Sequence, residues 1–124
     1  MSLTSLRKLI NETDMFISQH AIYISKLERA IKNCQEFTHK TCHECNFGVK
    51  WDSMVVPIKD GLPEEVKALV EEIEKIHCEF HEVSMQVDPK NHQSSDEEKL
   101  DRMKKLSASL FQKLLALKRL VKEE

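Results

Sequence analysis

Glycine and proline are scarce in this chain, which has 2 glycines and 3 prolines among 124 residues. Residues that interrupt helices are therefore rare. The apolar side chains recur at intervals of three to four residues, which is the period of a helix and not of a strand. We expect an all-α fold. At this length we expect a single domain, residues 1–124, that can bury a modest core without disulfide staples.

Long apolar runs and a large net charge are also missing. The apolar runs span a few residues each, far below the roughly 20 that a membrane helix needs, and the amino terminus lacks the apolar core of a signal peptide. The 19 basic and 21 acidic side chains nearly cancel, so no overall positive field is available to hold a phosphate backbone. We expect a soluble, cytoplasmic protein that binds neither nucleic acid nor membrane.

Apolar residues at helical spacing predict three long helices, over residues 6–34, 63–87 and 94–121. The first is expected to run without a break. A capping box, in which a hydroxyl and a carboxylate bond free amides of the first turn, predicts a short helix beginning at Thr41-x-x-Glu44. A similar box opens the last long helix. Three long helices and one short one predict an antiparallel four-helix bundle.

Three histidines have the placement of metal ligands. His20 occupies an apolar seam position, where an unpaired polar group would cost a few kcal/mol. His77 and His81 stand one helical turn apart, roughly 6 Å between β-carbons, so both can reach one ion. Simpler interpretations are that His20 is a core histidine bonded to a neighbour and that the pair is solvated on a charged face.

The sequence Cys-Asn-Phe-Gly-Val-Lys-Trp, residues 45–51, supplies a fourth ligand type. Cys45 is expected in the first turn of the short helix, where the helix dipole favours the thiolate that a metal requires. Phe47 and Trp51, four residues apart, are expected to share the side that packs into the bundle. Gly48 is best explained by close approach of another helix. The simpler interpretation of Cys45 is a buried free cysteine.

Four cysteines in a chain that we expect to be soluble and intracellular favour metal or redox chemistry over structural disulfides. Cys42-x-x-Cys45, with two histidines nearby, is a competing zinc motif, but it lacks the second Cys-x-x-Cys of a zinc ribbon. Cys42 is therefore expected to be an extra thiol beside the site. Cys34 and Cys78 are expected at helix cores or edges.

The ligand candidates follow one another in a definite order: His20, the Cys-x-Phe-Gly-x-Trp motif of residues 45–51, then His77-x-x-x-His81. This order resembles the chemoreceptor zinc-binding domain, a small bacterial helical module often attached to chemoreceptors and diguanylate cyclases. The resemblance covers residues 14–83. The family usually has an aromatic residue, most often Trp, three positions after its first histidine, and this chain has Tyr23 there.

The resemblance implies a regulatory module that binds Zn²⁺ through His20, Cys45, His77 and His81. It implies that the module senses zinc availability or oxidants through its metal-bound thiolate, in chemotaxis or cyclic-di-GMP signalling. We expect Cys45 to be the redox switch and Cys42 to capture its sulfenic acid as a disulfide. A signalling output protein or domain would be the partner. The alternative is a zinc-stapled structural bundle or dimerisation module without a sensing role.

A homodimer is also expected, because the last helix has apolar residues beyond one seam and dimerisation is common in the family. An enzyme is disfavoured, because four protein ligands would close the coordination sphere. A zinc hydrolase would need Cys45 off the metal. A di-iron carboxylate site needs two Glu-x-x-His motifs, and only Glu74-x-x-His77 fits.

Overall fold

The computed structural model describes residues 2–123, and within that range it contains helices and no strand. The elements are α1 (Ser2–Ile10), α2 (Thr13–Asn33), α3 (Asn46–Met54), the 3₁₀ helix η1 (Val56–Gly61), α4 (Glu64–Met85) and α5 (Asp96–Glu123). The predicted all-α fold is confirmed. None of these helices is long and apolar enough to cross a membrane.

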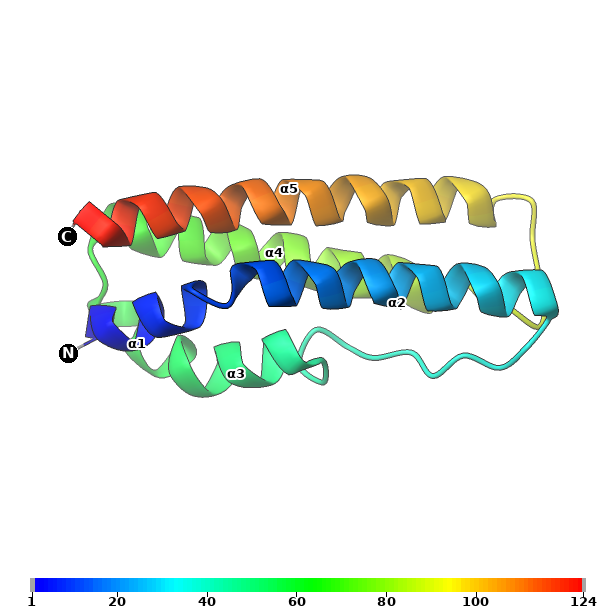
Figure 1. Cartoon of the computed structure of the whole chain (residues 1–124), viewed down its shortest axis with the longest axis horizontal. Helices are drawn as coiled ribbons and strands as arrows, with labels where there is room; N and C mark the ends of the chain where they lie inside the picture. The colour runs from blue at the N-terminus through cyan, green and yellow to red at the C-terminus, as the bar shows by residue number, and fades with distance from the viewer. Residues whose placement is uncertain (1, 124) are drawn as a thin grey trace.

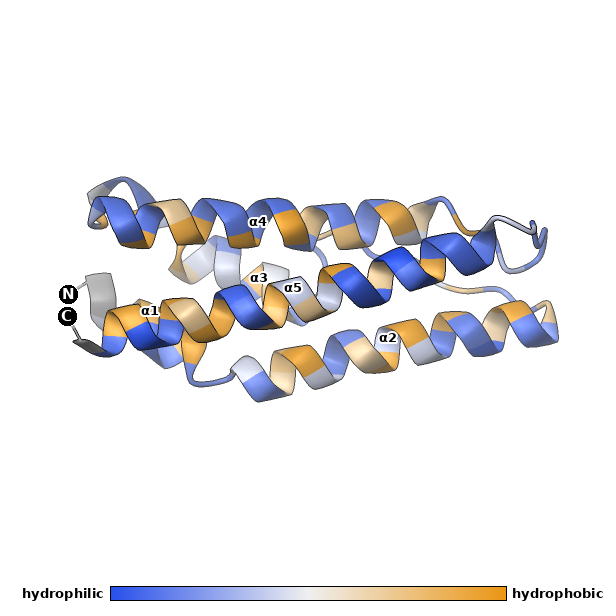
Figure 2. Cartoon of the chain, turned by 90° about the horizontal axis from the view of Figure 1, so that it is seen from above, coloured by the Kyte–Doolittle hydropathy of each residue, from blue (hydrophilic) through white to orange (hydrophobic). Residues whose placement is uncertain are grey.

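The three long helices lie along the long axis of the molecule (Figure 1). α2 and α4 run in one direction, and α5 returns in the other. Between α2 and α3 the chain is extended over residues 35–41 and also runs back along the molecule, so α3 occupies one end only. Orange and blue segments alternate along α2, α4 and α5 (Figure 2), as expected of helices with one buried side.

The prediction of one unbroken helix over residues 6–34 is wrong at Asn11 and Glu12, which separate α1 from α2. The Thr13 hydroxyl donates a hydrogen bond to the carbonyl of Ile10. A threonine side chain that bonds a nearby carbonyl in this way competes with the helical ladder. The break lets α1 contact both α3 and α5.

The other helix starts also differ from the capping boxes. Glu44 accepts a hydrogen bond from the Thr41 amide at 2.8 Å, but the pair closes a turn and α3 begins only at Asn46. Cys45 was predicted to lie within the first turn of this helix, but it is the N-cap of α3, directly before the observed first turn. Its sulfur accepts a hydrogen bond from the Gly48 amide at 3.4 Å.

The ends of the two following helices are close to their predicted positions. α4 starts directly after Pro63, as predicted, and ends at Met85. α5 begins at Asp96, whose buried carboxylate accepts a hydrogen bond from the Gln93 amide at 2.9 Å. This side chain takes the place of the predicted box that began at Ser94.

The core consists of two apolar clusters. The first contains Leu6, Leu9, Ile10, Phe16, Phe47, Trp51, Val55, Leu62, Val66, Val70, Ile73, Leu110, Leu114, Leu117 and Val121. The second contains Ile24, Leu27, Phe80, Val83, Val87, Leu100 and Met103. On α2, His20 lies one turn from Phe16 of the first cluster and one turn from Ile24 of the second. On α4, His77 lies between Ile73 of the first cluster and Phe80 of the second. The buried histidines therefore form a polar layer that divides the core.

Gly48 is needed because another segment of backbone lies against it. A Cβ atom at this position would stand 1.7 Å from the carbonyl oxygen of Cys42 and 2.7 Å from its carbonyl carbon. The predicted close approach is thus real, but the neighbour is the preceding loop and not another helix. The contact presses Cys42 and His43 onto the start of α3, where Cys45 lies.

We predict that Gly48→Ala destabilises the fold by about 1–3 kcal/mol, because the new methyl group collides with backbone that cannot rotate away. Urea denaturation of the two proteins measures the difference. Gly61→Ala is the matched control, since nothing lies within 4 Å of a Cβ there. Equal effects of the two substitutions would contradict the proposed close contact.

Candidate metal centre

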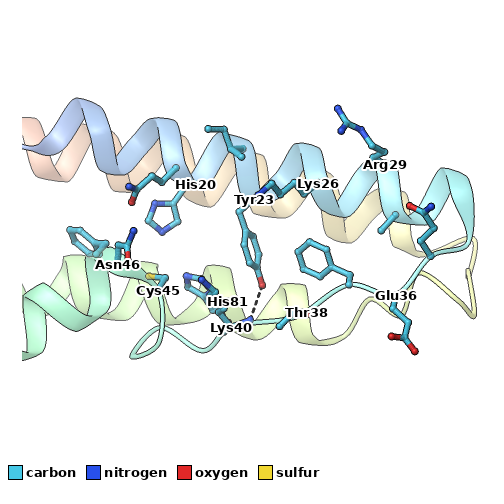
Figure 3. Close-up of a pocket in the computed structure, with 16 residues that line it drawn as sticks. His20, Tyr23, Lys26, Arg29, Glu36, Thr38, Lys40, Cys45, Asn46 and His81 are labelled. Carbon is cyan, nitrogen blue, oxygen red and sulfur yellow. Dashed lines mark hydrogen bonds between the residues drawn. The ribbon is translucent and has the colours of Figure 1, made fainter.

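The structure brings His20, Cys45, His77 and His81 into one cluster whose potential ligand atoms all lie within 4.8 Å of one another. His20 comes from α2, His77 and His81 come from α4, and Cys45 directly precedes α3. Figure 3 shows His20, Cys45 and His81 of this cluster. The three histidines are 4%, 3% and 2% exposed. A solvated His77–His81 pair is therefore excluded, and the cluster is one that could hold a metal ion.

Two backbone carbonyls determine the orientation of two of the rings. Nδ1 of His20 donates to the carbonyl of Phe16 at 2.8 Å, and Nδ1 of His81 donates to the carbonyl of Lys40 at 2.8 Å. A carbonyl only accepts, so each Nδ1 carries the proton and each Nε2 keeps its lone pair. Both Nε2 atoms are buried without a hydrogen-bond partner. Buried unpaired nitrogens of this kind are costly, and a metal ion is the partner they fit.

The remaining two ligand candidates face each other directly. The sulfur of Cys45 lies 3.2 Å from Nε2 of His77. Tetrahedral zinc, with bonds of about 2.0–2.3 Å, places its ligand atoms roughly 3.3–3.8 Å apart. The cluster is therefore close to the size that such an ion requires. Three imidazoles and one thiol are also a donor set that suits zinc.

Burial keeps the histidines neutral. It lowers the pKa of His77 to about 2 and that of His81 to about 4, and a proton on His20 would repel a proton on either ring and lower both pKa values further. Burial also lowers the pKa of His20, against the opposing effect of its bond to Phe16. Neutral imidazole is the form that binds metal, so these three side chains need lose no proton at neutral pH.

Cys45 behaves differently from the expectation based on the helix dipole. Burial raises the pKa of its thiol and outweighs the backbone amides of Gly48 and Phe47, which lower it. Desolvation of the thiolate is thus the larger effect in the metal-free protein. The positive charge of a bound metal would favour the thiolate.

The aromatic residues of the motif, Phe47 and Trp51, both pack into the bundle, as predicted. Phe47 is 2% exposed, and its ring centroid lies 4.7 Å from that of His77. Trp51 is 3% exposed and donates through Nε1 to Glu74 at 2.9 Å. Phe47 therefore shields the ligands, and Trp51 anchors α3 to α4.

Tyr23 supports the orientation of His81 indirectly, through Lys40. Its hydroxyl forms a hydrogen bond with the Ser84 hydroxyl at 2.9 Å. It also accepts a hydrogen bond from the Lys40 amide at 3.2 Å (Figure 3). The carbonyl of Lys40 is the one that orients His81. Sequence reasoning missed the roles of Phe16 and Lys40, because a backbone carbonyl leaves no trace in the choice of residue.

The cysteine assignments need a correction. Cys42 and Cys78 form a disulfide with their Cα atoms 4.8 Å apart, whereas Cys34 and Cys45 are free. The segment that leads into α3 lies against α4, which brings Cys42 to Cys78. In this state Cys42 has no thiol with which to capture a sulfenic acid at Cys45. The two cysteines of Cys42-x-x-Cys45 also belong to separate clusters, so the competing zinc motif is not formed.

A groove of about 530 Å³ leads to the cluster between α2 and residues 35–47 (Figure 3). His20, Cys45 and His81 line it together with Lys26 and Arg29. Cys45 is the candidate ligand that is only partly buried, so it is the one that small molecules in solution reach most readily.

Comparisons with known proteins leave the family open. No family model matches the chain, and no match was found among curated proteins or solved structures. The family resemblance therefore rests on the residues described above.

We predict that the metal-free protein loses stability as the pH falls below about 6.5. The unfolded chain takes up protons near the ordinary pKa of 6.5, whereas the folded chain does so only near 4 at His81 and near 2 at His77. The unfolded state thus binds more protons between these values, so the free energy of unfolding decreases as the pH is lowered. Urea titrations across this range measure the slope, and His81→Gln should make it shallower. An unchanged slope in that variant would contradict the assignment.

Proposed function

We propose that this chain is a regulatory module that binds one Zn²⁺ through His20, Cys45, His77 and His81 and signals through the release of Cys45. One observation carries the proposal: two buried imidazole nitrogens without partners belong to a cluster with a third imidazole and a thiol. When bound, zinc would satisfy these nitrogens and stabilise the thiolate. Four protein ligands leave no open position for substrate, which favours a regulatory role over an enzymatic one.

The arrangement of the chain supports membership of the chemoreceptor zinc-binding family as part of this proposal. We assign the fold as an antiparallel four-helix bundle with α2, α4 and α5 as the long helices and α3 as the short one. The motif of residues 45–51 begins at the N-cap of α3 and continues into that helix. Its output would be a signalling protein or domain in chemotaxis or cyclic-di-GMP control.

Cys45 is the ligand best suited to act as the switch. The histidines come from α2 and α4, which are 21 and 22 residues long, whereas α3 has 9 residues. Cys45 is only partly buried and lines the groove. Hypochlorous acid would convert its thiolate to a sulfenic acid with release of chloride, and a sulfenic acid is a poor metal ligand. Loss of this ligand, or of zinc itself, would free α3 to move.

A zinc-stapled structural bundle is the second candidate, and the divided core favours it. The ligands lie between the two apolar clusters, so an ion there would tie them together. The candidates differ in their response to a chelator. A stapled bundle should lose its helical circular dichroism, while a sensor should stay folded and show faster hydrogen exchange mainly in residues 42–54.

We predict that the purified chain contains one tightly bound zinc and that His20→Ala and His77→Ala each weaken its binding more than 100-fold. Such a loss should exceed the roughly 10–100-fold cost of losing an outer-shell partner. Competition with a chelator measures the affinity of the tightest-bound ion. Cys42→Ala is the control, because the sulfur of Cys42 is bonded to Cys78 and is not one of the four candidate ligand atoms. If Cys42→Ala proves the most damaging variant, the Cys42-x-x-Cys45 site is correct instead.

We predict that hypochlorous acid releases zinc in step with oxidation of Cys45. The test uses Cys34→Ser, because Cys34 is a free and exposed cysteine that would consume oxidant. With the disulfide intact, Cys45 is then the remaining free thiol. A metallochromic dye follows the zinc, and mass spectrometry maps the oxidised residue. Retention of zinc after complete oxidation of Cys45 would eliminate the redox switch.

We further propose that the module is a symmetric homodimer built on α5. Leu106 and Leu120, two of the extra apolar residues of α5, pack against the chain's own clusters, whereas Phe111 is part-exposed. We predict a light-scattering mass of twice 14.5 kDa and a shift toward monomer in Phe111→Glu. A monomer mass for the unmodified chain at high concentration would remove this proposal.

A further inference from the structure

A second group of potential metal ligands lies outside the centre described above. Potential ligand atoms of Cys42, His43 and Cys78 lie within 4.8 Å of one another, and the group shares no residue with the first cluster. Cys42 and His43 precede α3, and Cys78 lies on α4 directly after His77. The group therefore joins the segment before α3 to α4, which are two of the three segments that the first centre brings together.

The surroundings of this group are those of a site open to solvent. All three residues line a cavity of about 240 Å³ together with Asp52. The side chain of His43 is 66% exposed, whereas Cys42 is 9% exposed. An ion could enter here directly from solution and find the two sulfurs at the inner wall.

The ring of His43 is held by a carboxylate. Its Nδ1 lies 2.7 Å from Oδ2 of Asp52. A hydrogen bond from one ring nitrogen to a carboxylate is the usual way to fix a metal-binding histidine, and it leaves Nε2 as the donor atom. Two thiolates and one such imidazole form a Cys₂His set, which zinc binds with a water or a further ligand in the fourth position.

We propose that Cys42, His43 and Cys78 bind a second Zn²⁺ when the Cys42–Cys78 disulfide is reduced. A dithiol reductant supplies two electrons and two protons to the S–S bond, which gives two thiols while the reductant becomes a disulfide. Zinc binding then displaces these two protons as the sulfurs become thiolates. A small-molecule disulfide reverses the sequence: it takes two electrons from the two thiolates and is itself cleaved to two thiolates, while Cys42 and Cys78 form their disulfide and lose their ion.

The second site should be the weaker of the two. It offers three protein ligands and an exposed histidine, whereas the first offers four ligands with three buried histidines. The second ion should therefore bind last and leave first when a chelator is added. The zinc content of the chain would then report the redox state of this cysteine pair, while the first centre stays loaded. This extends the proposed function and does not depend on a signalling role for Cys45.

The experiment compares reduced and disulfide-bonded forms of the full chain. Metal is removed with a chelator, one half is reduced with a phosphine, which takes oxygen from water and competes weakly for zinc, and both halves are titrated with Zn²⁺ without air. We expect two ions per chain in the reduced form and one in the oxidised form. A parallel Co²⁺ titration should show stronger thiolate charge-transfer absorption from the second ion than from the first, because it binds two sulfurs.

Variants separate the two sites. Cys78→Ser should bind one ion under both conditions, and Cys34→Ser, the matched control, should behave as the unmodified chain. His20→Ala should retain one ion in the reduced form only, which shows the second site even if the first centre fails. One ion in the reduced unmodified chain, with no added thiolate absorption, would overturn the proposal. That measurement needs no variant, so misfolding of Cys78→Ser could not hide the result.

Discussion

The structure depends on two hydrogen bonds, from His20 to the carbonyl of Phe16 and from His81 to the carbonyl of Lys40. They fix which nitrogen of each ring carries its proton, and so leave two unprotonated nitrogens in the middle of the core. An apolar core tolerates such atoms only if something compensates them. The division of the core into two clusters, with aromatic rings of Phe47 and Phe80 against the histidines, is built around that requirement.

The four candidate ligands differ in how firmly the fold holds them. His20, His77 and His81 belong to long helices with buried faces, and they stay neutral because burial opposes their charged forms. Cys45 lies at a junction between an extended segment and a short helix. The three histidines lie on long helices, whereas Cys45 directly precedes the short helix α3. In such an arrangement, a chemical change at the sulfur of Cys45 can shift the position of α3.

The sequence predicted the parts of this protein that depend on periodicity. Seam positions revealed the helices and the burial of His20, and Phe47 and Trp51 pack as their spacing suggested. Interactions of the irregular segments escaped prediction. The break at Glu12 depends on one threonine hydroxyl, and the pairing of Cys42 with Cys78 depends on the path of a segment without periodicity. The raised pKa of the Cys45 thiol depends on burial, which the dipole argument ignored.

The two hydrogen bonds made by the backbone of Lys40 limit how the length of this chain can change. Its amide is held by Tyr23 of α2 and its carbonyl by His81 of α4. Surface connections ordinarily accept insertions and deletions with little cost. Here both Lys40 and the sulfur of Cys45 are held in place, so the number of residues between them is fixed. A single added or deleted residue would move that sulfur away from His77. Length changes should be tolerated earlier, near Gln35, and a conserved count from Lys40 to Cys45 would be the mark of this module among diverged relatives.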